Sequence, residues 1–210
     1  ADEGMVELCF QDPNILRIKG KGVGLKLTQQ VKDGSSVSFP ISDDKQQWRC
    51  QQGGFAHYVF TGLKGEVAGD PAKTVIFEPI PDRPQLILDI EPDESGEFEA
   101  ALEQYYDAYA DKSYAKPFDD CVKETRESIE SFSQKVLPVS QELDDLFKLA
   151  VYVKWSSVVA EKGFITREAM YCSKNTMNAV WAWDNCFGAM ATCYTDLQWA
   201  LDQILVMFDH

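Results

Sequence analysis

The spacing of apolar residues changes part-way along the 210-residue chain, and this change limits the fold more than any other feature of the sequence. Up to about residue 92, apolar residues occur in short stretches that turn-forming pairs separate, such as Asp33-Gly34 and Gly53-Gly54. Several short strands at this spacing are typical of an antiparallel β-sandwich. We therefore predict strands within 5–10, 15–18, 23–27, 37–39, 55–61, 74–77 and 86–90.

From residue 116 onward, apolar residues recur at the i, i+3, i+4, i+7 spacing that places them on one face of a helix. The first such segment runs from Phe118 to Val136, and Pro138 follows it. A second segment opens at Ser140, with Gly163 in the position where helices often end. The sequence thus predicts two amphipathic helices in this part of the chain.

The C-terminal part predicts an irregular segment followed by a pair of helices. Residues 163–182 show no regular period, and a segment of this length between helices often surrounds a functional site. A short helix is expected from about Asp184 to Tyr194, and Thr195 and Gln198 then form a capping-box pattern. The apolar stripe of the helix behind this box consists of Leu197, Ala200, Leu201, Ile204, Leu205 and Phe208. Together the two helices predict an αα-hairpin, the repeating unit of a helical barrel.

An acidic, proline-bearing segment at 91–96 indicates a domain boundary. We predict a β-sandwich domain over 1–92, a linker over 93–115 and the start of a helical domain over 116–210. Aromatic and apolar residues recur at helical spacing over 97–111, so this part of the linker is expected to be a helix. The last helix is still amphipathic where the chain stops, and we expect the helical domain to be truncated.

The composition argues against several classes of function. A formal charge of −14 opposes binding to nucleic acid or to anionic membrane surfaces, and no apolar run reaches the ~20 residues of a membrane span. The six cysteines form no C-x-x-C pair and no cluster with histidine, which argues against a zinc site. We expect no metal or cofactor, and free buried thiols in a reducing, cytoplasmic compartment.

The segment from Trp181 to Asp184 places two indoles next to a carboxylate at the start of a helix. Indole faces stack on apolar planes or on the C–H faces of sugars, and a carboxylate accepts hydroxyl protons. The segment therefore fits a ligand-facing turn that opens a helical hairpin. The alternative is a helix start with buried tryptophans and an Asp that caps the helix.

Four segments around this motif are together similar to one block of a known enzyme family. They are 173–177 (SKNTM), 180–187 (VWAWDNCF), 199–202 (WALD) and 208–210 (FDH). The block resembles the opening of the catalytic domain in glycoside hydrolase family 63 and related bacterial enzymes. Those enzymes are six-hairpin (α/α) barrel glycosidases, and many carry a β-sandwich ahead of the barrel. The resemblance implies an α+β, multi-domain chain with an antiparallel β-sandwich followed by the first helices of such a barrel.

The resemblance also implies roles for individual residues. In the family, the residue that matches Asp184 binds sugar hydroxyls, and the residues that match Trp181 and Trp183 form aromatic walls. The general acid and general base lie further along the barrel, so no catalytic residue is identified in this chain. Lys174 and Arg167, which are near the motif in the sequence, are candidates to contact a carboxylate on a substrate such as a glycerate. The candidate substrate-binding residues are Trp181, Trp183, Asp184, Phe187, Lys174 and His210.

The sequence therefore favours a glycoside hydrolase that acts on α-linked glucosyl or mannosyl substrates, with inversion of configuration by resemblance. Its expected partners are an oligosaccharide or glycoside substrate and the remainder of the barrel polypeptide. One alternative is a carbohydrate-binding or structural fragment without catalysis of its own. Another is an interaction module in which Trp181 and Trp183 belong to the core.

Overall fold

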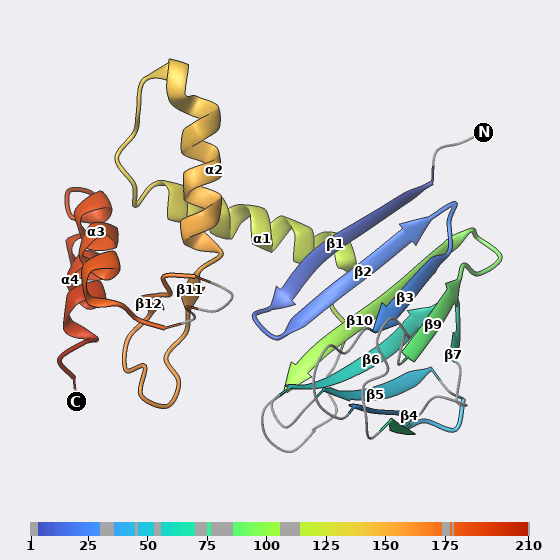
Figure 1. Ribbon diagram of the computed structural model, residues 1–210. Helices are drawn as coiled ribbons and strands as arrows, with labels where there is room; N and C mark the ends of the chain where they lie inside the picture. The colour runs from blue at the N-terminus through green and yellow to red at the C-terminus, as the bar shows by residue number, and fades with distance from the viewer. Residues whose placement is uncertain are drawn as a thin grey trace. The chain divides into compact units, whose positions relative to one another are not determined.

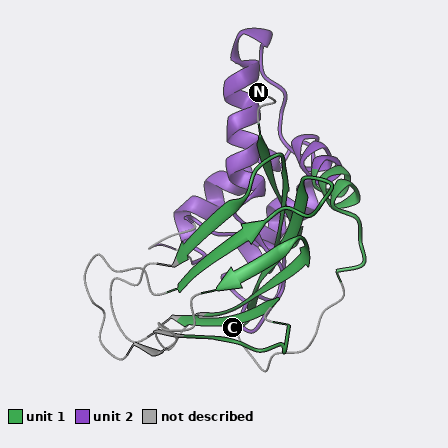
Figure 2. Cartoon of the chain, turned by 90° about the vertical axis from the view of Figure 1, so that its right-hand side faces the viewer, with its two compact units in different colours: residues 1–125 green, residues 126–210 purple. Residues whose placement is uncertain are grey.

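The computed structural model describes residues 4–29, 36–44, 46–52, 56–69, 75–76, 86–105, 114–173, 177 and 179–209. The chain divides into two compact units, Ala1–Thr125 (unit 1) and Arg126–His210 (unit 2). Antiparallel sheets make up most of unit 1, and helices make up most of unit 2 (Figures 1 and 2). The fold is mixed α+β, which confirms the predicted class at this level.

In the described part of unit 1, the strands form two antiparallel sheets (Figure 1). One sheet has seven strands in the order β1-β2-β10-β6-β5-β4-β8, and the other has three in the order β3-β9-β7. The strands are β1 (Met5–Asp12), β2 (Ile15–Lys21), β3 (Leu25–Gln29), β4 (Ser36–Pro40), β5 (Gln47–Gln52), β6 (Ala56–Lys64), β7 (Glu66–Gly69), β8 (Val75–Ile76), β9 (Leu86–Glu91) and β10 (Glu97–Tyr105).

Side chains from both sheets pack in one hydrophobic cluster. Trp48, Phe60 and Phe98 come from the seven-stranded sheet, and Leu88 and Ile90 come from the three-stranded sheet. All five are almost completely buried. Because side chains alternate between the faces of a strand, one face of each sheet must supply this cluster. The core of unit 1 therefore lies between the two sheets.

The predicted helix at 97–111 is wrong over 97–105, because these residues form β10. β10 lies between β2 and β6 and pairs with both in antiparallel register. Both of its faces are covered: Phe98 and Ala100 contribute to the core, while Glu103 on the opposite face accepts a hydrogen bond from the Tyr114 hydroxyl at 3.1 Å. A strand that is buried on both faces lacks the alternation of apolar and polar residues by which strands are recognised in a sequence. The spacing of the large residues in β10 therefore resembles a helical period. The rest of the predicted helix lies outside the described residues.

The helices of the C-terminal part form where the apolar spacing predicts them. α1 (Phe118–Ser133) spans the division between the units, and it is followed by a 3₁₀ turn, η2 (Gln141–Leu143), and by α2 (Asp144–Trp155). A short hairpin, β11 (Val158–Val159) with β12 (Ala169–Met170), precedes α3 (Ala182–Thr192) and α4 (Leu197–Leu205). α2 ends at Trp155 rather than at Gly163, which has φ 60° and lies in the turn between Lys162 and Ile165.

The core of unit 2 is built around Trp199 of α4. Trp199 clusters with Phe132, Val151 and Met170, which come from α1, α2 and β12. The rings of Phe132 and Trp199 pack edge to face with centroids 5.5 Å apart. The helices α1, α2 and α4 therefore each contribute apolar side chains to a shared centre, as amphipathic helices do.

All six cysteines are free, as predicted. Cys9, Cys50 and Cys121 are buried, whereas Cys186 is exposed, so the expectation that every thiol is buried is wrong. Cys186 follows the buried Asn185 on α3, and adjacent helical positions face different sides. Within the described residues, no helix combines the length and the apolar character that a membrane span requires.

The close approach of Phe98 to Gly20 offers a test of the packing in unit 1. The two residues are register partners, and a Cβ atom at Gly20 would lie 2.0 Å from Phe98 Cε1. Because the backbone and a buried ring would have to move, we expect Gly20→Ala to lower the free energy of unfolding by about 1–3 kcal/mol. Urea denaturation measures this loss.

The variant Phe98→Leu provides the control for this prediction. It removes the ring that the new methyl group meets, so the double variant Gly20→Ala/Phe98→Leu should lose less than the sum of the two single losses. Strictly additive losses would show that the two positions do not contact each other.

Candidate functional site

The motif predicted from the sequence lies at the N-terminus of α3. Trp181 is the N-cap residue, in an extended conformation with φ −122° and ψ 129°, and no side chain makes a capping hydrogen bond there. Asp184 is the third residue of the helix, in the first turn. The alternative in which Asp184 caps the helix is therefore wrong. A carboxylate in this turn is still favourable, because it lies near the positive end of the helix dipole.

The aromatic residues of the motif are exposed. Trp181 is 43% exposed, Trp183 is 68% exposed and Phe187 is 59% exposed. Trp183 and Phe187 are four residues apart on one face of α3, and their ring centroids lie 5.8 Å apart at an interplanar angle of 65°. The alternative in which Trp181 and Trp183 belong to the core is therefore wrong, because neither indole is buried in unit 2. Exposed indoles at a helix start are available to stack on a ligand.

The two carboxylate oxygens of Asp184 have different surroundings. Its Oδ1 atom accepts a hydrogen bond from the Cys172 thiol at 3.2 Å. Its Oδ2 atom is buried and has no hydrogen-bond partner within the described part of the structure. This hydrogen bond, then burial, then the charge of Asp184 raise the pKa of the Cys172 thiol above its usual value. A buried carboxylate oxygen without a partner is costly, so Oδ2 is an acceptor that the described residues leave unsatisfied.

A buried pair of amides holds the start of α3 in place. Asn185 and Gln203 are both fully buried. The backbone N–H of Trp181 donates to Asn185 Oδ1 at 3.3 Å, and Asn185 Nδ2 donates to Gln203 Oε1 at 3.4 Å. Gln203 Oε1 also accepts the N–H of Met170 at 2.8 Å, and Gln203 Nε2 donates to the Glu168 carbonyl at 3.0 Å. These bonds join α4, the β12 segment and the beginning of α3.

Sequence analysis did not identify this amide pair. Gln203 lies one position away from the predicted apolar stripe, and an uncharged polar residue on a helix is normally expected on the solvent side. The buried face of α4 actually consists of Trp199, Ala200, Gln203 and Val206. Leu197, Leu201 and Leu205 of the predicted stripe are exposed, and so is Phe208. The stripe is therefore displaced around the helix from the position that apolar spacing predicts.

Arg167 is engaged within the protein. It forms ion pairs with Asp202 (Nη1 to Oδ1, 2.9 Å) and Asp209 (Nε to Oδ2, 2.7 Å), and Thr166 also donates to Asp209. The hydrogen bonds to Asp209 and Asp202 raise the pKa of the guanidinium. These pairs fasten the segment before β12 to α4 and to the residues after it, so Arg167 supports the fold of unit 2.

The capping residue of α4 is Asp196 rather than Thr195. Asp196 Oδ1 accepts the N–H of Trp199 at 3.0 Å, and Asp196 Oδ2 pairs with Lys135 Nζ at 3.0 Å. The backbone hydrogen bond lowers the pKa of this carboxyl group, opposed by burial, and Lys135 lowers it further. Thr195 instead donates to the Lys135 carbonyl. The capping-box interpretation is therefore wrong, because Asp196 is the N-cap residue and the Thr195 hydroxyl donates to the carbonyls of Lys135 and Thr192 instead of accepting a helix N–H.

The two remaining predicted site residues, Lys174 and His210, lie outside the described residues. Glu168 accepts the indole N–H of Trp199 at 2.8 Å, so its carboxylate supports the core of unit 2. The described residues contain no group of three or more His, Cys, Asp or Glu side chains that would hold a metal ion. The site that the structure does show consists of Trp181, Trp183, Asp184, Phe187 and Cys172, here called the α3 site.

Comparisons of the chain with protein-family models, with curated proteins and with solved structures find no match.

The contact between Cys172 and Asp184 is testable by thiol chemistry. Asp184→Asn removes the charge that raises the pKa of Cys172, so the thiolate fraction at pH 8.5 should increase. We expect the alkylation of Cys172 by iodoacetamide to become roughly two- to tenfold faster, as measured by site-resolved mass spectrometry. The exposed Cys186 serves as the internal control and should react at an unchanged rate. Unchanged labelling of Cys172 would contradict the contact.

The amide pair is testable by a replacement of similar size. Gln203→Met leaves the N–H of Met170 buried without its acceptor. We expect the free energy of unfolding to fall by about 1–3 kcal/mol, as measured by urea denaturation. Gln198→Met, the same replacement at an exposed position of α4, is the matched control and should change stability by less than about 0.5 kcal/mol. Equal effects of the two substitutions would argue against the network.

Proposed function

We propose that unit 2 supplies the sugar-binding segment of a glycoside hydrolase of the six-hairpin barrel type, acting on α-linked glucosyl or mannosyl substrates with inversion. The observation that carries this proposal is the Oδ2 atom of Asp184, which has no hydrogen-bond partner among the described residues and belongs to a residue that follows two exposed indoles in the sequence. A sugar has both complementary features, since its hydroxyls donate hydrogen bonds and its C–H faces stack on aromatic rings.

The geometry supports an anchoring role for Asp184. The helix N-terminus and the amide pair hold the first turn of α3, and the Cys172 thiol occupies Oδ1. Oδ2 therefore has a fixed position before any ligand arrives, and a preorganised acceptor loses little entropy on binding. Trp183 and Phe187 extend the apolar surface along the next turn of the helix.

Hydrolysis needs two carboxyl groups, which lie ~6.5–9.5 Å apart in inverting enzymes. In the described part of unit 2, several acidic side chains already have structural partners. Asp202 and Asp209 pair with Arg167, Asp196 caps α4, and Glu168 binds the indole of Trp199. We propose that the general acid and base belong to the remainder of the barrel polypeptide, so this chain alone should not turn over a glycoside.

The proposal extends to the architecture of the two units. Unit 1 would be the β-sandwich that precedes the barrel, and the α3–α4 hairpin would be one of the barrel's helical pairs. The exposed row formed by Trp183, Phe187 and Met190 on α3 and by Tyr194 just beyond it supports this, because barrel hairpins have neighbours on both sides. The further barrel helices are then the expected partner of this chain.

A second candidate function is carbohydrate binding without catalysis. It is favoured by the same structural engagement of the acidic residues, because a binding module needs aromatic platforms and acceptors but no proton transfer. The two candidates share the α3 site and differ in whether further polypeptide adds the catalytic carboxyl groups.

We expect maltotriose, or an α-linked mannobiose, to quench the tryptophan fluorescence of the chain saturably. Trp183→Ala should weaken the affinity about tenfold, the equivalent of ~1.4 kcal/mol, because the exposed stacking surface is lost. Asp184→Asn should weaken it roughly ten- to a hundredfold, because a charge-assisted hydrogen bond is worth about 1.5–3 kcal/mol. Calorimetric titration measures the affinities of the variants.

Tyr194→Ala is the matched control, since Tyr194 is an exposed aromatic residue two positions beyond the C-terminal end of α3. It should leave the affinity unchanged. Equal losses in Tyr194→Ala and Trp183→Ala would indicate non-specific adsorption, and the absence of quenching by either sugar would overturn the proposal. Measurable turnover of an aryl α-glucoside by the purified chain would contradict the placement of the acid and base outside it.

A further inference from the structure

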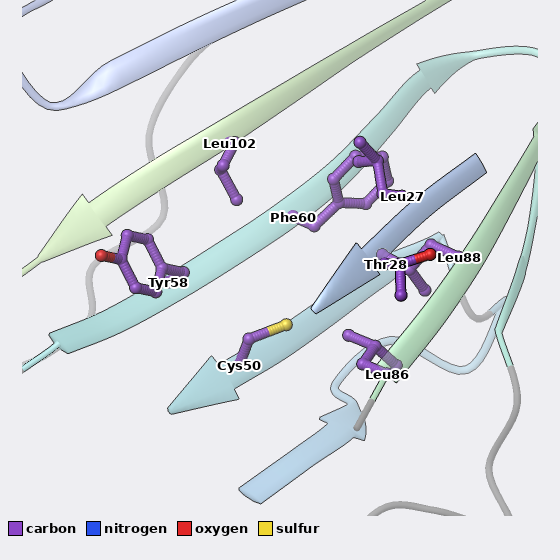
Figure 3. A pocket seen from close by; sticks show the side chains of 8 residues that line it. All are labelled: Leu27, Thr28, Cys50, Tyr58, Phe60, Leu86, Leu88 and Leu102. Carbon is purple, nitrogen blue, oxygen red and sulfur yellow. The ribbon is translucent and has the colours of Figure 1, made fainter. Parts of the chain in front are cut away.

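Unit 1 contains a cavity between its two sheets, with a volume of about 270 Å³. Its walls are side chains of β3 and β9 from the three-stranded sheet and of β5, β6 and β10 from the seven-stranded sheet (Figure 3). Protein interiors are close-packed, and voids larger than a water molecule are few. A space of this size between two sheets is therefore a candidate ligand site rather than an ordinary packing defect.

The cavity arises because the inner face of the core is filled unequally. Trp48 and Cys50 are two residues apart on β5, so both side chains point to the same side of the sheet. Trp48 pairs with Phe60 across the strands, whereas Cys50 pairs with Tyr58. Where the first pair fills the core with two large rings, the second offers one ring and a small thiol. The difference in side-chain volume leaves space beside Cys50.

The walls of the cavity are suited to an uncharged group. Leucine side chains make up half of the lining, and none of the eight described lining residues carries a formal charge. Burial raises the pKa of the Cys50 thiol to about 11, so this side chain is neutral and apolar at physiological pH. Because an unpaired charge is costly to bury, the part of a ligand that enters must be a hydrocarbon group.

The lining of the cavity differs in exposure from one end to the other. Leu86 and Leu88 on β9 are buried, whereas Tyr58 and Leu102, on the facing sheet, are only partly buried. Figure 3 shows the Tyr58 ring at one end of the group, with its hydroxyl directed away from the other labelled side chains. A polar hydroxyl therefore marks one partly exposed end of a mainly apolar lining.

We propose that unit 1 binds the hydrocarbon group of a small amphiphile between its two sheets, with the polar end of the ligand near the Tyr58 hydroxyl. The volume exceeds the ~150 Å³ of apolar cavities that take up benzene and is close to the ~300 Å³ lower bound of small-molecule pockets. The site is separate from the α3 site, so its test does not depend on the proposed sugar-binding function.

The experiment uses the 210-residue chain with 1-octanol and octanoate as probes, in calorimetric titrations. We expect saturable binding of at least one probe, accompanied by a higher melting temperature, because a ligand that binds the folded state stabilises it. Stronger binding of 1-octanol would identify a neutral polar end, and stronger binding of octanoate would identify an anionic one. Either preference supports the proposal.

Cys50→Phe is the informative variant, because a ring at this position fills the space that the ligand would occupy. We expect at least tenfold weaker binding of the better probe together with an unchanged or higher urea midpoint. Cys186→Phe makes the same replacement at an exposed position of α3 and should bind the probe as the parent chain does. If Cys50→Phe does not fold, Leu102→Phe narrows the cavity from the partly buried wall and replaces it in the comparison.

The proposal is overturned if neither probe binds saturably, or if a folded cavity-filling variant binds as tightly as Cys186→Phe. It is also overturned if benzene binds while neither amphiphile does. That result would describe a closed apolar void without access for a polar end near Tyr58.

Discussion

The buried amide of Gln203 is the contact on which the arrangement of unit 2 depends. One side chain accepts the N–H of Met170, donates to the carbonyl of Glu168 and accepts from Asn185. A fully buried amide has no water to replace a missing partner, so the three segments that it joins must keep one geometry. Hydrophobic contacts around Trp199 supply the burial, but they are not directional. The amide pair supplies the specificity.

The α3 site follows from this constraint. Asn185 holds the backbone at Trp181, which sets where α3 begins and therefore where the side chains of its first turn point. The same network holds the β12 strand, two residues before Cys172, whose thiol occupies one oxygen of Asp184. The second oxygen has no partner among the described residues, and the two indoles that precede it in the sequence are exposed. Sugar binding is the proposed function that uses all of these features together.

The structure of unit 1 depends on a different constraint. Its order comes from strand register, which places side chains of alternating positions in a core between two sheets. Register determines which residues face each other, but it does not require their volumes to match. Where Trp48 faces Phe60 the core is filled, and where Cys50 faces Tyr58 a cavity remains. The proposed amphiphile site thus depends on side-chain size within a regular sheet, whereas the α3 site depends on a polar network.

Local spacing of apolar residues was sufficient to predict the α+β class, the helices α1 to α4 and the position of the Trp181 motif at a helix start. Such spacing reports which side of a short segment avoids water, and it acts over a few residues. It failed for β10, because a central strand is buried on both faces and its partners β2 and β6 are distant in the sequence.

Long-range contacts decided the features that matter most for function. The sequence indicated that Trp181 and Trp183 accompany a carboxylate, but either burial or exposure was compatible with it. The tertiary structure exposes both indoles, assigns the cap of α4 to Asp196 and pairs Asp184 with Cys172. A hydrogen bond between side chains twelve residues apart, or a cavity between two sheets, depends on how the backbone brings segments together. Such contacts leave no periodic signal in the sequence, so only the tertiary structure determines them.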